Sequence, residues 1–443
     1  MALLLQADGK AAVSVPICDL STLNFAARQG DRISAQGIAA LGLIGFLLAW
    51  LAITLFKIHS IGLIVTGFMA LTGLPMVIGS IVGNSTYARP STGLAVRRHF
   101  ANWSRIRIKL IGLFGTFATL WILYSFIPEY NRAFYRPVWD IIVLLSLPVV
   151  CLSLPYTMWI DNRMKEPEDG YFHAGLLFLG RWNEINEAEL RLYGLSWLVK
   201  GFFLPFMLAG AADRLNVLNR EGINFSSFGY LYASGVNLTY TIDVVFGAIG
   251  YLMTLRILDA QIQSVESTIL GWLCTICCYV PFSTLIWTYV LNYKGKTNWY
   301  DWLAHYPVVC ITWGFAIMIL HVIYVWSTCS FGCRFSNLTN RGIITHGPYR
   351  YLKHPAYLSK NIAWWLMSVP FVAHHTFWDA FRACICLLIT NFIYGLRAWT
   401  EERHLLHDPA YQVYSAWIEE HGLGSQFRSL WKKKIAKQTV ATN

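Results

Sequence analysis

The sequence predicts an all-α fold, a polytopic transmembrane helical bundle of about ten spans. Three observations predict it: 56% of the 443 residues are hydrophobic, only 13% are charged, and the hydrophobic residues gather in long runs. A soluble domain carries about 25% charged residues, so this chain has too few charges to cover a soluble surface. Runs of about 20 apolar residues are the length that crosses a bilayer.

The order of the apolar runs gives the expected spans. They are placed at 37–56, 61–83, 109–127, 136–160, 193–211, 229–255, 268–292, 307–327, 359–373 and 376–396. The ninth is short and contains Pro370, which interrupts a helix. We therefore expect a half-helix or a re-entrant hairpin with the tenth span, joined by a tight connection near His374 and His375, with protein covering the freed backbone.

Basic residues are concentrated in alternate loops. The loops after the second, fourth and eighth spans and the C-terminal tail are rich in Arg and Lys, whereas the loops between them are poorer. Such a bias marks the cytoplasmic side of a membrane protein, so both termini are expected in the cytoplasm. It also accounts for the net charge of +11 without a nucleic-acid partner, and we predict none.

Four regions are expected along the chain. Residues 1–36 read as a polar arm, 37–306 as an N-terminal transmembrane region of about seven spans, 307–425 as a membrane core carrying the chemistry, and 426–443 as a basic tail. The cysteines in apolar runs, Cys278 among them, are read as small hydrophobic residues. Cys329 and Cys333 lack the partners of a metal site, and no metal is predicted.

Two polar sequences flank the ninth and tenth spans. The first runs from Asn337 to Tyr357, and the second, Arg397-Ala-Trp-Thr-Glu-Glu-Arg-His404, follows the tenth span. An antiparallel hairpin brings the two together at one membrane face. Together they supply a histidine, two carboxylates, several arginines and aromatic rings, and a candidate active site facing the cytoplasm is expected here.

These residues resemble a known family. The stretch Gly347-Pro-Tyr-Arg-Tyr-Leu-Lys-His354-Pro355-Ala-Tyr357, a helical hairpin and then Glu401-Glu402 is similar to the isoprenylcysteine carboxyl methyltransferases. The wider group includes membrane phospholipid N-methyltransferases. The resemblance covers about residues 307–425 and implies an S-adenosylmethionine-dependent methyltransferase acting on a membrane lipid or lipidated acceptor.

The resemblance also implies roles for individual residues. His354 and nearby backbone amides would hold the amino-acid end of the cofactor, Tyr357 would pack against it, and one of the two glutamates would bind its ribose or ammonium group. Arg397, one turn before Glu401, would steady an anionic group of substrate or cofactor. The predicted catalytic residues are Arg397 and Glu402, and the predicted cofactor-binding residues are Gly347, Tyr349, Arg350, His354, Pro355, Tyr357, Glu401 and Glu402.

Some positions depart from the family pattern or allow a second reading. Lys353 stands where Arg is usual and lacks its planar fork. Adjacent helical residues point about 100° apart, so Glu401 and Glu402 are expected to have different partners, the second being Arg350. Arg403 and Lys360 read equally well as orientation signals. Asp243, in the middle of the sixth span, either pairs with another helix or binds substrate.

Two other functions compete with methyl transfer. A ten-helix sterol reductase would have a similar span count and use NADPH, but its usual motif Arg-x-x-Asn-Tyr-x-Gly-Asp is replaced here by His354-Pro355-Ala-Tyr357. A non-catalytic transporter or lipid-binding protein would show a degraded cofactor site or paired broken helices, and the sequence shows neither.

Overall fold

The computed structural model describes residues 33–95, 100–293, 298–372 and 376–425. The connection around His374 and His375 lies outside them, as do most of the N-terminal arm and the basic tail. The described chain is mostly helical with very little strand, and the predicted all-α class is confirmed. Its helices are α2 (Ala35–Leu55), α3 (Ile61–Ile78), α4 (Trp103–Phe126), α5 (Arg136–Asp161), α6 (Gly170–Phe178), α7 (Glu187–Glu221), α8 (Phe228–Leu252), α9 (Ile269–Ile276), α10 (Phe282–Leu285), α11 (Trp299–Leu303), α12 (Pro307–Phe331), α13 (Pro355–Ser368), α14 (Phe377–Leu405) and α15 (Pro409–His421).

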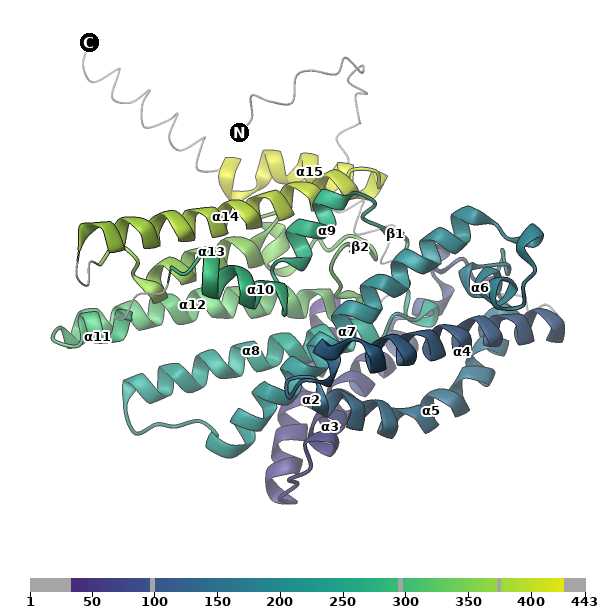
Figure 1. Cartoon of the computed structure of the whole chain (residues 1–443), viewed down its shortest axis with the longest axis horizontal. Coiled ribbons are helices and arrows are strands. Elements are labelled where there is room, and N and C mark those ends of the chain that lie inside the picture. The colour runs from purple at the N-terminus through teal and green to yellow at the C-terminus, as the bar shows by residue number, and fades with distance from the viewer. Residues whose placement is uncertain (1–32, 96–99, 294–297, 373–375, 426–443) are drawn as a thin grey trace, which may run out of the picture.

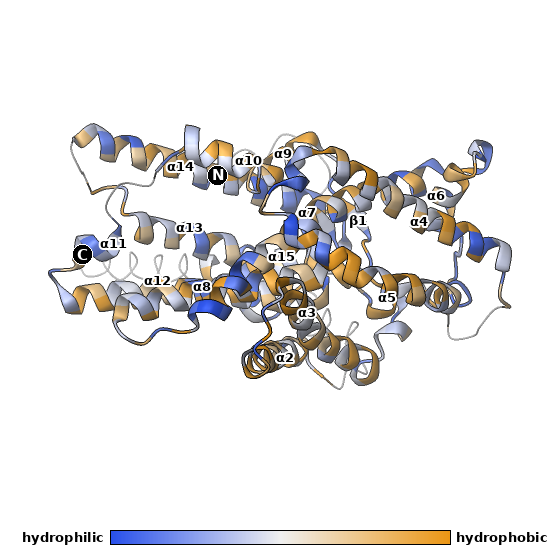
Figure 2. Ribbon diagram, turned by 60° about the horizontal axis from the view of Figure 1, so that its bottom comes forward, coloured by the Kyte–Doolittle hydropathy of each residue, from blue (hydrophilic) through white to orange (hydrophobic). Residues whose placement is uncertain are grey.

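Eight of the described helices are long and apolar enough to cross a membrane: α2, α3 with its π-helical end to Gly83, α4, α5, α7, α8, α12 and α14. The protein is thus a multi-pass membrane protein. The predicted ninth span is shorter than a full span, because α13 ends at Ser368. Figure 2 shows apolar residues around the whole circumference of α2 and α3, as expected for helices facing lipid on one side and protein on the other.

The predicted seventh span, 268–292, is not one helix. It divides into α9, the short α10 and the π-helical turn Ile286–Val290. Pro281 stands between α9 and α10, where a proline cannot donate the backbone hydrogen bond that continues a helix. The break leaves residues 277–281 as irregular backbone, which a membrane protein tolerates only where it is buried in protein or lines a cavity.

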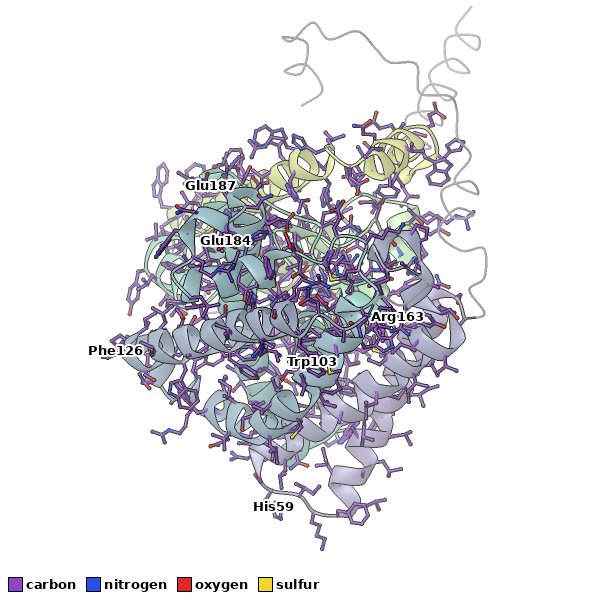
Figure 3. All side chains as sticks on the ribbon, turned by 90° about the vertical axis from the view of Figure 1, so that its right-hand side faces the viewer. His59, Trp103, Phe126, Arg163, Glu184 and Glu187 are labelled. Atoms are coloured by element: carbon purple, nitrogen blue, oxygen red, sulfur yellow. The ribbon has the colours of Figure 1, made fainter. Side chains whose placement is uncertain are left out.

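The helices form two groups on either side of α7. Figure 1 shows α8, α12, α13 and α14 side by side in one group, with α4, α5 and α6 in the other. The α2–α3 hairpin packs beneath them, and its turn, marked by His59, lies at the opposite end of the molecule from α15 (Figure 3). The same view shows α4 running across the molecule from Trp103 to Phe126.

Close helix pairs depend on glycine at a few positions. A Cβ on Gly45 would lie 2.0 Å from the carbonyl oxygen of Leu71, so α2 and α3 touch backbone to backbone. Gly112 of α4 and Gly175 of α6 allow the same approach between those two helices. A Cβ on either would lie 2.2 or 2.0 Å, respectively, from a backbone carbonyl oxygen of the other helix. Small residues at helix contacts are the usual means of close packing in membranes.

Several loop arginines that read as orientation signals have partners inside the fold. Asp259 accepts hydrogen bonds from Arg89 (3.2 Å) and Arg334 (2.6 Å). Asp161 accepts two from Arg105, at 2.9 and 2.7 Å. The first two ion pairs join the loops after the second and eighth predicted spans to the segment after α8, and the third joins the start of α4 to the end of α5. The charges therefore stabilise the fold whichever way it is oriented. The cytoplasmic position of the termini stays a prediction.

Arg341 connects the end of α8, the segment after α8 and the turn that follows α12. Its side chain is 3% exposed and donates to five backbone carbonyls, those of Gly250, Met253, Ala260, Cys333 and Phe335. Next to it, β1 (Ser264–Val265) pairs antiparallel with β2 (Thr339–Asn340). These contacts hold the beginning of the polar stretch 337–357 against the C-terminal end of α8.

Candidate active site

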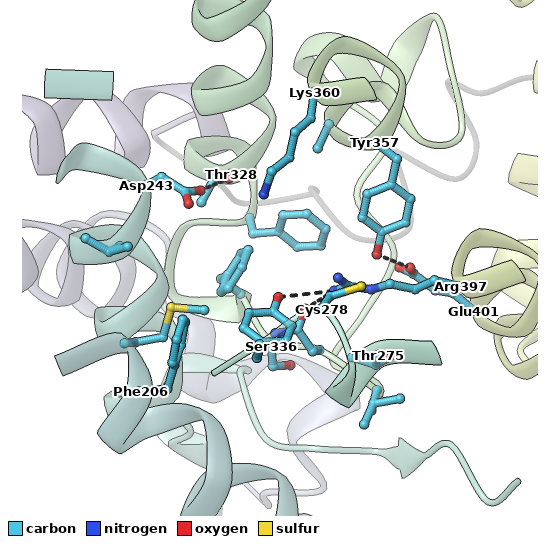
Figure 4. A pocket seen from close by; sticks show the side chains of 18 of the residues that line it. Phe206, Asp243, Thr275, Cys278, Thr328, Ser336, Tyr357, Lys360, Arg397 and Glu401 are labelled. Atoms are coloured by element: carbon cyan, nitrogen blue, oxygen red, sulfur yellow. Dashed lines mark hydrogen bonds between the residues drawn. The ribbon is translucent and has the colours of Figure 1, made fainter. Parts of the chain in front are cut away.

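A cavity of about 400 Å³ lies where the two predicted polar sequences meet. Its walls come from α7, α8, the broken segment around Tyr279, α12, the loop 335–339, α13 and α14 (Figure 4). Small-molecule sites in proteins usually have volumes of 300–1,000 Å³ and combine apolar walls with a few polar groups. This cavity is the candidate site of the chemistry.

The start of α13 places two of the predicted residues. His354 is the residue before the helix and Pro355 its first residue, a position where the missing N–H of proline has no intrahelical partner to lose. The imidazole of His354 stacks on Tyr357, with ring centroids 5.4 Å apart and planes 3° from parallel. A turn that begins a helix therefore also aligns two rings at the cavity wall.

The end of α14 holds the two glutamates, which have different partners as the helical spacing predicts. Glu401 Oε2 accepts a hydrogen bond from the Tyr357 hydroxyl at 2.8 Å. Glu402 Oε1 lies 2.9 Å from His354 Nε2. Each carboxylate of α14 thus fixes one ring of α13, and the pair of contacts locks the helical hairpin at this end.

The predicted partner of Glu402 was wrong. Arg350 is exposed and forms no ion pair with the residues that the structure describes. Lys353 lies close to Glu402 instead, at 3.6 Å from Oε2, and also binds Glu419 (2.9 Å) and the Ser415 hydroxyl (2.8 Å) of α15. An ammonium group can share its donors among separate acceptors, so Lys353 links α15 to the hairpin. An arginine at this position would instead favour bidentate binding of one carboxylate.

Arg397 lies one turn before Glu401, and its side chain is 6% exposed. Its Nη2 donates to Asn337 Oδ1 at 2.6 Å and to the Tyr279 hydroxyl at 3.3 Å. The guanidinium carbon also lies 5.0 Å from the ring centroid of Tyr357. Among the described residues no carboxylate comes within ion-pair distance, so a buried positive charge faces the cavity with neutral partners.

The structure brings five of the predicted site residues together and leaves four outside the cavity wall. Tyr349, His354, Tyr357, Arg397 and Glu401 line it. In the described part of the chain, the wall does not include the other four, Gly347, Arg350, Pro355 and Glu402.

Gly347 and Tyr349 show what the residues before α13 do. Gly347 has φ = +61°, and a Cβ there would lie 2.5 Å from Ser330 Oγ, so glycine is required for the turn. The carbonyl of Tyr349 accepts a hydrogen bond from the Tyr414 hydroxyl of α15 at 2.7 Å. Burial raises the pKa of both tyrosines well above their usual value, which keeps the Tyr414 hydroxyl a neutral donor.

Sequence reasoning missed several residues of the wall. Cys278 and Tyr279 were placed within a continuous span, and Lys360 was read equally as an orientation signal, yet all three line the cavity. Pro281 was the available signal for the first two, because a proline in the middle of an apolar run predicts a break. Nothing in the sequence distinguishes Lys360 from a residue at a membrane edge.

Asp243 of α8 pairs with another helix, one of the two roles that the sequence left open, whereas its role in substrate binding stays a prediction. Its carboxylate accepts hydrogen bonds from Tyr324 and Thr328 of α12, the latter at 2.6 Å, so it joins two helices. It also lines the cavity.

Comparison with known proteins finds one family that matches the part of the chain around the candidate site. No curated protein and no solved structure gives a significant match to the chain. Residues 308–407 match the model of the isoprenylcysteine carboxyl methyltransferase family, a segment that begins in α12 and ends after α14. All five predicted residues that line the cavity fall within it. The C-terminal part of this multi-pass membrane protein therefore matches the isoprenylcysteine carboxyl methyltransferase family, and this match supports a membrane methyltransferase.

Proposed function

We propose that the protein is an integral membrane methyltransferase that uses S-adenosylmethionine and acts on a lipid or lipidated acceptor. The observation that carries the proposal is that the segment matching the family, 308–407, contributes His354, Tyr357, Arg397 and Glu401 to one cavity. The cofactor supplies an electrophilic methyl group on a sulfonium. The protein's task is to hold that group against a nucleophile, and such positioning can lower a barrier by about 7–11 kcal/mol.

The charges of the cavity suit the cofactor. Its carboxylate needs a cation, and Arg397 is a buried guanidinium without a carboxylate among the described residues. Its ammonium or ribose hydroxyls need an acceptor, and Glu401 presents a carboxylate to the cavity. Its sulfonium is a cation that suits aromatic faces, which Tyr357 and Tyr394 provide.

Glu402 and His354 have different roles in this proposal. Glu402 holds His354, so it positions the imidazole and does not touch the cofactor. His354 lines the cavity directly. We therefore assign cofactor binding to His354, Tyr357, Arg397 and Glu401, and we assign Glu402 as a positioning residue.

Binding measurements on the purified protein test the proposal. We would titrate S-adenosylmethionine and, separately, NADPH into the full chain by calorimetry, with His354→Ala, Glu401→Ala and Glu402→Ala as variants. We expect micromolar binding of S-adenosylmethionine, its loss in Glu401→Ala and a smaller weakening in Glu402→Ala. Glu420→Ala, an exposed glutamate of α15, is the control and should bind as the wild type does.

Two results would contradict the proposal. Binding of NADPH with none of S-adenosylmethionine would favour the sterol reductase alternative. Equal binding by the wild type and Glu401→Ala would mean that the cofactor lies elsewhere.

A further inference from the structure

A second polar pair lines the cavity apart from the residues assigned to the cofactor. Asp243 comes from α8, outside the segment that matches the family, and Lys360 comes from α13. Both line the cavity, and Figure 4 shows the two side chains pointing toward the same part of it. Ionisable groups inside a membrane are costly to bury and usually serve a function.

The carboxylate of Asp243 retains acceptor capacity. One oxygen accepts a hydrogen bond from Tyr324 and the other from Thr328. A carboxylate has about four lone-pair sites, so two protein donors leave room for another. Within the described chain no cation lies at ion-pair distance from Asp243, and its hydrogen-bond donors there are two hydroxyl groups.

Lys360 has donors but, among the described residues, no acceptor. Its Nζ lies 5.0 Å from the ring centroid of Tyr324, 5.5 Å from that of Trp364 and 6.0 Å from that of Tyr394. The first of these rings carries the hydroxyl that binds Asp243. Lys360 and Asp243 are therefore neighbours of the same tyrosine without forming an ion pair with each other.

We propose that the space between Asp243 and Lys360 is the acceptor subsite, and that it takes the hydroxyl group of an alcohol or phenol carried on an apolar molecule. A hydroxyl donates to a carboxylate and accepts from an ammonium at the same time. A carboxylate in this place would face Asp243, and a protonated amine would face Lys360, and both like-charge contacts are unfavourable. Phe206, Tyr240 and Phe335 in the cavity wall supply surface for the apolar part.

This subsite rests on the proposed methyltransferase function and defines its reaction. The oxygen of the acceptor attacks the methyl carbon, the carbon–sulfur bond of the sulfonium donor breaks, and a carbon–oxygen bond forms. The hydroxyl proton passes to Asp243, and the products are a methyl ether and the neutral thioether. Lys360 stabilises the negative charge that develops on the oxygen. A general base in such a position contributes about 10²- to 10⁴-fold to the rate.

Binding of three matched probes tests the subsite without the cofactor. The probes are a 15-carbon isoprenoid alcohol and the carboxylic acid and amine with the same chain, each titrated into the full protein in nanodiscs. The wild type should bind the alcohol at least tenfold more tightly than the acid or the amine. Asp243→Asn should lose this preference by binding the acid better, and Lys360→Met should lose it by binding the amine better. Asp140→Asn, an exposed aspartate of α5, should keep it.

The outcomes separate a ligand role from a structural one. A merely structural Asp243 would weaken all three probes alike and leave the order unchanged, which would overturn the proposal. Tighter binding of the acid or the amine by the wild type, or binding of none of the three, would overturn it as well.

The chemistry of the product gives an independent readout. The protein is incubated with methyl-labelled S-adenosylmethionine and the membrane lipids of its source cells, and the labelled lipid is treated with mild alkali and then extracted with acid. We expect a neutral label that resists alkali, as a methyl ether does. Release of labelled methanol, a basic labelled product, or no labelled lipid would refute the subsite. If S-adenosylmethionine binds in these cases, the methyltransferase proposal still stands, whereas failure of cofactor binding removes both.

Discussion

Replacing Arg397 by methionine should separate cofactor binding from stability. The guanidinium is buried beside the cavity, with one short hydrogen bond to Asn337, a longer one to Tyr279 and contacts with aromatic rings. Burying an ion costs several kcal/mol, which a well-placed carboxylate would offset. The described residues provide none, so in the proposed function the carboxylate belongs to the cofactor.

The size of the effect follows from these contacts. Removing one partner of a buried charge pair costs about 2–5 kcal/mol of binding, or roughly 30- to several-thousand-fold in the dissociation constant. In the cofactor-free protein, Arg397→Met removes hydrogen bonds and ring contacts, which lowers the stability. It also removes the cost of burying a charge, which raises the stability. The stability of the cofactor-free protein should therefore change by no more than about 1 kcal/mol.

Thermal unfolding in detergent with and without S-adenosylmethionine measures both quantities. At a concentration 100 times the wild-type dissociation constant, binding stabilises the wild type by about 2.7 kcal/mol. A variant that binds 100-fold more weakly gains only about 0.4 kcal/mol at that concentration. Arg382→Met, an exposed arginine of the same helix, serves as the control and should keep the full stabilisation.

Two results would refute the reasoning. If Arg397→Met binds S-adenosylmethionine within about threefold of the wild type, the guanidinium does not hold the cofactor. If the cofactor-free variant loses about 3 kcal/mol or more, Arg397 is chiefly a structural residue.

Three further predictions concern other contacts. Arg341→Met should destabilise the protein by about 3 kcal/mol or more, because five backbone carbonyls lose a charged donor; unchanged thermal unfolding would contradict this. Gly45→Ala should lower the unfolding temperature, since its Cβ would lie 2.0 Å from a backbone oxygen of α3, whereas Gly194→Ala, with nothing within 4 Å, should raise it slightly. Tyr357→Phe removes one hydrogen bond to Glu401 and should weaken cofactor binding by about 1–1.5 kcal/mol, or roughly tenfold in calorimetry; a larger loss in stability than in binding would argue against the assigned role.

Part of the site could be predicted because it lies in short, ordered sequences. His354 and Pro355 start a helix and the Glu401–Glu402 pair comes near the end of another, so a hairpin brings them together from connectivity alone. The different partners of the two glutamates follow from the helical rotation of about 100° per residue. The identity of a partner does not follow, and Lys353 rather than Arg350 lies beside Glu402 because α15 folds back onto the hairpin.

The assembly of the far wall of the cavity could not be predicted, although single residues gave signals. Asp243 and Tyr279 are more than 70 residues from Tyr357 along the chain, and apolar periodicity tells only that a helix crosses the membrane, not which side chains of two helices meet. The predicted continuous seventh span hid Cys278 and Tyr279, because hydropathy alone defined that span and took no account of Pro281, which signals a helix break.

The sequence by itself determined the fold class and the family-like motif. The shortage of charged residues excludes a soluble fold, because a bilayer solvates apolar surface and water does not. The tertiary structure decided which charges are neutralised and which face a cavity. Asp259 and Asp161 form ion pairs with arginines, whereas Asp243, Lys360 and Arg397 form no ion pair with the described residues and line one cavity. Charge pairing depends on distances of a few ångströms between helices remote in sequence, which residue order does not specify.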